Sequence, residues 1–163
     1  MSDRDISSLM RKTIFSAVVA TGLFGAGIFG FYLGWHQIKR PMLVPLAFHG
    51  VTDKPSYPWE ITANDLDSMI RQFKRHDFAA VAPASLSSML DNGFTGRNML
   101  ITFDDGLSTS AEAIKQLYRD HGIRSVFFVI TDLLGKPGYV DKNTLLELQN
   151  NFGCHIGLHG RRH

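Results

Sequence analysis

The sequence predicts an α/β domain with a parallel sheet, preceded by one N-terminal transmembrane helix. The first observation is the segment 14–35, which carries no Asp, Glu, Lys or Arg. The second is the alternation of strand-like and helix-like segments beyond Pro41, a pattern typical of βαβ units with parallel strands. With 163 residues and 44% hydrophobic content, the chain is long enough for one domain with a real core.

The N-terminal part divides into a polar tail over 1–13, the apolar segment 14–35 and a short basic linker over 36–43. As a helix, the apolar segment would measure roughly 33 Å, enough to cross the hydrocarbon core of a bilayer. We interpret it as an uncleaved signal anchor. A cleaved signal peptide is the alternative, since Arg11 and Lys12 precede the segment, but no clear A-x-A site follows it.

Within the predicted domain, 44–163, apolar runs rich in strand formers alternate with amphipathic segments. Thr62 or Asn64 can cap the first helix, Ser108 or Ser110 the third, and Asp141 or Asn143 the last. Gly122 and Gly153 follow the last two helices as stop signals. We expect strands at about 44–48, 79–82, 98–103, 125–130 and 154–158, and helices at about 62–76, 83–90, 108–121 and 141–150.

Two carboxylates follow one of these strands, in the stretch Ile101–Gly106 with the sequence ITFDDG. In a parallel α/β sheet, ligands bind outside the carboxyl ends of the strands, so Asp104 and Asp105 are candidates for chemistry. The alternative is an ordinary polar turn, because Asp-Gly is also a common turn signal.

Two histidines stand near the end of the chain, at His159 and His163. This spacing places both imidazoles on the same side of a helical turn, where both can reach one metal ion. A carboxylate with two histidines is a three-ligand set of the kind found at catalytic metals. Taken alone, the pair has a simpler explanation as a chance pair in a polar loop.

ITFDDG followed by IGLHGRRH resembles the first two motifs of the NodB-type polysaccharide deacetylases, the family 4 carbohydrate esterases. The resemblance runs from about Val44 to His163 and implies a partial (β/α) barrel. It also implies that Asp104 is the catalytic base and that Asp105, His159 and His163 hold a divalent metal, with zinc as the expected ion. One departure is Gly160, where the family usually has Ser or Thr.

The resemblance further implies that a metal-dependent enzyme removes N-acetyl groups from a polysaccharide outside the cytoplasm, with the anchor holding it at the membrane. A permuted subgroup, similar to the poly-N-acetylglucosamine deacetylases, carries its acid histidine on the first strand. His49, after the apolar run 44–48, corresponds to that general acid. A turn histidine that is only hydrogen-bonded or solvated is the alternative.

Composition excludes several other classes. The net charge is +2 and no long basic run exists, so nucleic acid is not an expected partner. The single cysteine, Cys154, excludes an intramolecular disulfide framework and is interpreted as a small core residue. The oligomeric state is left open.

Two other functions stay open, a metal-free carbohydrate-binding protein and a membrane-anchored interaction protein. The family's later motifs are not found, so we expect a chain truncated after the second motif. Such an incomplete barrel would leave sheet edges unpaired and apolar faces exposed, so we expect it to express poorly or aggregate and to have little deacetylase activity.

Overall fold

The computed structural model describes residues 41–162. The predicted tail 1–13, the predicted transmembrane helix 14–35, most of the linker and His163 lie outside the described residues. Within the described part of the chain, none of the helices combines the length and apolarity that a bilayer crossing requires.

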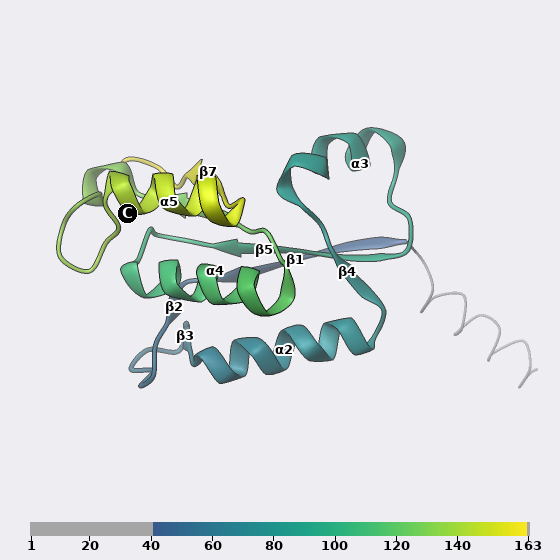
Figure 1. Cartoon of the computed structure of the whole chain (residues 1–163), viewed down its shortest axis with the longest axis horizontal. Coiled ribbons are helices and arrows are strands. Elements are labelled where there is room, and N and C mark those ends of the chain that lie inside the picture. The colour runs from purple at the N-terminus through teal and green to yellow at the C-terminus, as the bar shows by residue number, and fades with distance from the viewer. Residues whose placement is uncertain (1–40, 163) are drawn as a thin grey trace, which may run out of the picture. The chain divides into compact units, whose positions relative to one another are not determined.

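The described residues form the predicted α/β fold, in which all paired strands are parallel (Figure 1). The main sheet has the order β1-β5-β6-β7, and β4 also pairs with β5. Its strands are β1 (Met42–Phe48), β4 (Phe78–Ala80), β5 (Arg97–Phe103), β6 (Val126–Val129) and β7 (His155–Leu158). A second, two-stranded sheet pairs β2 (Gly50–Val51) with β3 (Glu60–Ile61).

The helices begin and end at the signals that the sequence carries, with one exception. Thr62 caps α2 (Ala63–Arg75) in a capping box with Asp65, and Asp141 caps α5 (Lys142–Phe152). Gly122 and Gly153 adopt left-handed conformations after α4 (Ser108–His121) and α5. The predicted helix 83–90 is a 3-10 turn over Pro83–Ser85 continued by α3 (Leu86–Asn92).

The exception is the start of α4, where the sequence predicted a Ser108 or Ser110 cap. Leu107 occupies the N-cap position and makes no side-chain cap hydrogen bond. The hydroxyl of Ser110 donates instead to the carbonyl of His49, far away in the sequence. A long-range contact therefore replaces the local cap.

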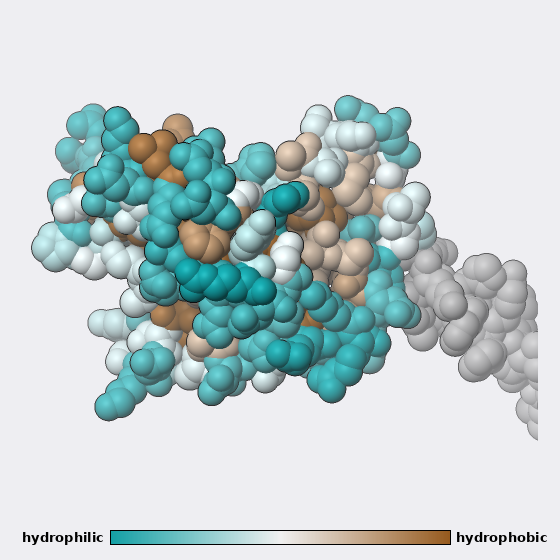
Figure 2. All heavy atoms as spheres, viewed as in Figure 1, coloured by the Kyte–Doolittle hydropathy of each residue, from teal (hydrophilic) through white to brown (hydrophobic). Residues whose placement is uncertain are grey.

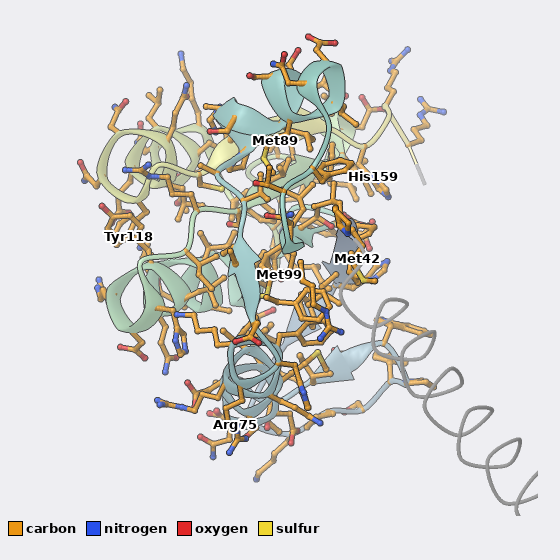
Figure 3. The ribbon with its side chains drawn as sticks, turned by 90° about the vertical axis from the view of Figure 1, so that its right-hand side faces the viewer. Met42, Arg75, Met89, Met99, Tyr118 and His159 are labelled. Carbon is orange, nitrogen blue, oxygen red and sulfur yellow. The ribbon has the colours of Figure 1, made fainter. Side chains whose placement is uncertain are left out.

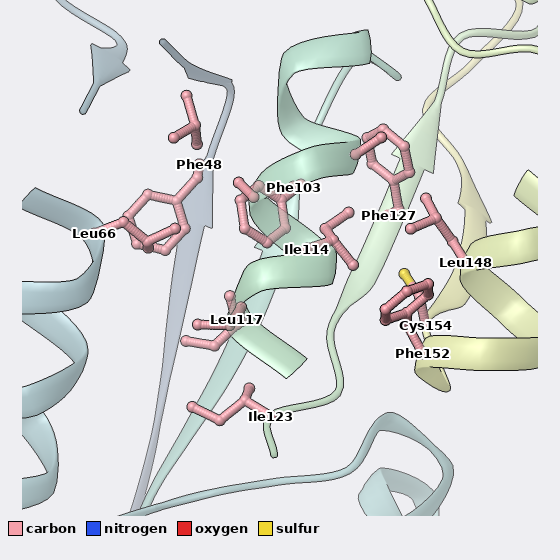
Figure 4. Packing of buried hydrophobic residues seen from close by; sticks show 14 of the residues in the cluster. Phe48, Leu66, Phe103, Ile114, Leu117, Ile123, Phe127, Leu148, Phe152 and Cys154 are labelled. Carbon is pink, nitrogen blue, oxygen red and sulfur yellow. The ribbon is translucent and has the colours of Figure 1, made fainter. Parts of the chain in front are cut away.

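The core lies between β5, β6 and the helices packed on them, as Figure 4 shows for Phe103, Phe127 and Ile114. Six consecutive positions of β5, Asn98–Phe103, are buried, as expected for a central parallel strand. Figure 3 places Met99 of β5 between α2, which carries Arg75, and the segment that carries His159.

Cys154 is a core residue, as predicted, with 1% of its surface exposed. Burial raises the pKa of its thiol to about 11, so the thiol stays protonated at neutral pH.

Polar contacts join neighbouring helices across the surface of the domain. Asp67 of α2 accepts a hydrogen bond at 2.8 Å from the imidazole of His121, at the end of α4. Lys115 of α4 contacts Glu147 of α5 at 3.0 Å. Its hydrogen bonds with Glu112 and, to a smaller extent, with Glu147 raise the pKa of the lysine.

Figure 2 shows apolar residues gathered at the surface between α3 and α5, within an otherwise mostly polar face.

Candidate metal and catalytic site

The carboxyl ends of β1 and β5 lie side by side at one rim of the sheet. Phe48 pairs with Phe103, the last residue of each strand, and the N–H of Asp104 donates to the carbonyl of Phe48 at 2.8 Å. His49 and Asp104 are the next residue on each strand, and both are half-buried. The parallel register therefore brings the predicted base and the predicted acid to the same edge.

The turn after β5 has an unusual backbone. Asp105 and Gly106 both have positive φ, at 69° and 79°. Asp tolerates this left-handed conformation better than most residues, and a non-glycine residue in it often marks a functional site. A Cβ on Gly106 would lie 3.3 Å from the Cβ of Val129, so the turn passes close to the end of β6.

The residue that follows β7 also contacts Val129, the last residue of β6. The N–H of His159 donates to the carbonyl of Val129 at 2.9 Å, one position beyond the Val129–Leu158 pair. Val129 is thus the common neighbour of the two turns that carry Asp105 and His159. As a result, the imidazole Nε2 of His159 lies 3.6 Å from the carboxylate Oδ1 of Asp105.

The segment after His159 differs from the prediction. The sequence predicted His159 and His163 on one helical turn, but residues 159–162 are not helical, and Gly160 has a φ of 91°. Only glycine adopts this conformation readily, so the chain turns there rather than coils. His163 lies outside the described residues.

A clamp formed by Asp132 holds this segment, and sequence analysis did not find it. Its carboxylate accepts from Nε of Arg161 at 3.2 Å and from Nε of Arg162 at 3.1 Å, and its N–H donates to the carbonyl of Arg161 at 3.2 Å. The N–H of Thr131 donates to the carbonyl of Gly160 at 3.2 Å. These contacts join residues about thirty positions apart, and no local sequence signal indicates them.

The donor set fits a divalent metal in part. Two ligands of a tetrahedral zinc ion, each about 2.0–2.2 Å from it, lie about 3.3–3.6 Å apart, and the 3.6 Å between Asp105 Oδ1 and His159 Nε2 falls at the upper end of that range. The Asp105 side chain is 18% exposed and that of His159 is 36% exposed, so the pair is sheltered but reachable. Within residues 41–162, no group of three such ligands occurs.

We expect Gly106→Ala to destabilise the chain by more than the roughly 1–2 kcal/mol that a left-handed alanine costs. The added methyl group would also press on Val129. Gly138→Ala is the matched control, because Gly138 has a φ of 86° and nothing lies within 4 Å of the place that a methyl group would take there. Urea denaturation measures both variants, and equal losses would show that the contact with Val129 contributes nothing.

Comparison with known proteins identifies a matching family for part of the chain. Residues 91–163 match the family model described as Polysaccharide deacetylase. That range includes Asp104, Asp105, His159 and His163 but not His49. No curated protein matches the sequence.

Solved structures with the same fold include several deacetylases. A de-N-acetylase from Aggregatibacter actinomycetemcomitans matches 70% of this chain and 53% of its own, with a TM-score of 0.63 and 20% identity. IcaB from Ammonifex degensii matches 74% of this chain and 54% of its own, with a TM-score of 0.66 and 23% identity. A polysaccharide deacetylase from Bacillus cereus matches 76% of this chain and 40% of its own, with a TM-score of 0.62 and 14% identity.

The chain therefore spans about half the length of the solved structures it matches, and at these identities the likeness shows the fold. The match of residues 91–163 confirms the resemblance to the polysaccharide deacetylases that the two motifs indicated. Residues 91–163, somewhat less than half of the chain, therefore match the polysaccharide deacetylase family.

Proposed function

We propose that the protein is a metal-dependent deacetylase that hydrolyses N-acetyl groups of a cell-surface or cell-wall polysaccharide. The observation that carries the proposal is the 3.6 Å distance between Asp105 Oδ1 and His159 Nε2, on the rim where His49 and Asp104 follow the neighbouring strands β1 and β5. Hydrolysis of an amide needs all of these groups near one another, because water must be activated and the amine must leave protonated.

Asp104 is the proposed general base. It takes a proton from the water molecule whose oxygen bonds to the acetyl carbonyl carbon. The C–N bond then breaks, and His49, the proposed general acid, gives a proton to the nitrogen of the leaving sugar. The products are acetate and a free amino sugar. Histidine suits this role because its ordinary pKa lies near neutrality.

Asp105, His159 and His163 would hold the divalent metal, for which zinc is the proposed ion. When bound, such an ion polarises the carbonyl and lowers the pKa of a bound water molecule. The clamp from Asp132 to Arg161 and Arg162 keeps the segment between the two histidines in place. We propose that the segment 14–35 anchors the enzyme, with this site outside the cytoplasm beside its substrate.

We expect the purified protein to carry one divalent metal ion per chain, and we expect the His159→Ala variant to lose that ion. The matched control is His155→Ala, an exposed histidine at the other end of β7. Metal analysis by mass spectrometry measures both variants. Unchanged stoichiometry in His159→Ala would rule out this ligand set.

Acetate release from an N-acetylated oligosaccharide tests the activity itself. Metal far below one per chain, with oligosaccharide bound but not cleaved, would favour the alternative of a metal-free carbohydrate-binding protein. Loss of acetate release on chelation, with recovery on added zinc, would support the enzyme.

A further inference from the structure

An exposed aromatic pair lies in the loop 52–59, between β2 and β3. Tyr57 and Trp59 are 56% and 55% exposed, and their rings stack with centroids 4.8 Å apart and planes 6° apart. Single exposed apolar residues are common on protein surfaces. Each ring of the stack covers the inner face of the other, so the pair offers a flat apolar face on the outer side of each ring, outside the core.

The loop is held in shape by Glu60. Its carboxylate accepts from the N–H of Ser56 at 2.7 Å and of Tyr57 at 3.1 Å, while its own N–H donates to the carbonyl of Tyr57 at 3.0 Å. Gly50, its partner on β2, makes room for it, since a Cβ there would lie 2.9 Å from the Cγ of Glu60. These contacts preorganise the aromatic pair in the absence of a ligand, and preorganisation lowers the entropic cost of binding.

The loop also lies at the end of the domain that carries the proposed active site. β2 begins directly after His49, whose carbonyl accepts from the hydroxyl of Ser110 in the first turn of α4. Figure 1 shows the loop between β2 and β3 at the end of the domain toward which β1 and β5 run. The stacked rings thus lie at the same end as the groups proposed to carry the chemistry.

We propose that Tyr57 and Trp59 form a subsite that stacks a pyranose ring of the polysaccharide, away from the sugar that is deacetylated. The C–H bonds on a pyranose face carry partial positive charge, and the faces of aromatic rings carry negative charge. Asp53 and Lys54, the charged residues of loop 52–59, cancel each other, so the surface suits an uncharged polymer. The inference rests on the proposed function.

A membrane surface is the competing partner, because Trp and Tyr also favour bilayer interfaces. The loop 52–59 has no excess of basic residues to attract anionic lipids. Two rings at one turn also offer little apolar area for insertion. The flat pair held by Glu60 fits a sugar face better than it fits lipid.

The test compares long and short substrates in the full-length protein. We expect Trp59→Ala to raise KM for an N-acetylated pentasaccharide about tenfold, which corresponds to a loss of about 1.4 kcal/mol of binding free energy. KM for an N-acetylated disaccharide, kcat and metal content should change less than twofold. Tyr57→Phe keeps the ring, and Leu90→Ala removes a side chain that is 62% exposed on α3, so both should match the parent.

Binding measured by calorimetry separates this inference from the proposed function. If the parent releases no acetate but Trp59→Ala weakens pentasaccharide binding about tenfold, the subsite stands and the enzyme proposal fails. If the parent is active and Trp59→Ala changes neither binding nor KM, the subsite is wrong. If Trp59→Ala instead lowers binding to phosphatidylcholine vesicles while KM is unchanged, the pair is a membrane contact and the inference is overturned.

Discussion

Asp104→Asn is expected to reduce turnover of an N-acetylated oligosaccharide by about a hundredfold or more in the full-length protein, the usual effect of losing a general base. Asparagine has nearly the same shape as aspartate, but its amide cannot take a proton from water. The backbone hydrogen bond from residue 104 to the carbonyl of Phe48 does not depend on the side chain, so the turn should keep its position. Acetate release under saturating substrate measures the effect.

Metal content distinguishes this variant from a change at the neighbouring acid. Asp104→Asn should keep the metal, whereas Asp105→Asn should bind it more weakly, since Asp105 is the residue that meets His159. Asp91→Asn, an exposed acid at the end of α3, is the control for charge alone. If Asp104→Asn kept more than half of the parent turnover, Asp104 would not be the base.

Much of the fold follows from local signals that the sequence carries. The run Asn98–Phe103 is buried over its whole length, and a continuous apolar run is the usual signature of a central parallel strand. Thr62, Gly122 and Gly153 end or begin helices for reasons internal to each helix. Strands β2 and β3 were missed because two residues are too few to show any periodicity.

The site was predictable in its parts but not in its geometry. A parallel register requires the ends of β1 and β5 to share a rim, so His49 and Asp104 could be placed together from the sequence. The approach of Asp105 to His159 depends on a left-handed aspartate and on two turns that share Val129. These features depend on tertiary structure, as does the clamp at Asp132, and a local pattern does not contain them.

The expected helical turn after His159 fails for a related reason. The spacing of His159 and His163 alone cannot distinguish a helix from a turn. Gly160 has a φ of 91°, which is incompatible with a right-handed helix, so the chain turns there. The family usually has Ser or Thr at this position, so this chain loses a side-chain hydroxyl there and gains backbone freedom. The Asp132 contacts with Arg161 and Arg162 offset part of that freedom.

His49→Ala is expected to lower kcat by about a hundredfold or more while leaving the metal content unchanged. His49 lies directly after β1, beside the strand end that carries Asp104, and outside the pair formed by Asp105 and His159. Its loss should therefore remove a proton donor for the leaving amine without removing a ligand. His155→Ala serves again as the control for an exposed histidine.

The leaving group provides a sharper test of the acid than the rate alone. A substrate whose amine leaves without needing a proton, such as an acetanilide with electron-withdrawing substituents, should be cleaved by His49→Ala with a much smaller loss than the sugar substrate. The reason is that a general acid contributes most when the departing nitrogen is most basic. Equal losses on both substrates would indicate that His49 positions the site, and turnover within about twofold of the parent would show that another group donates the proton.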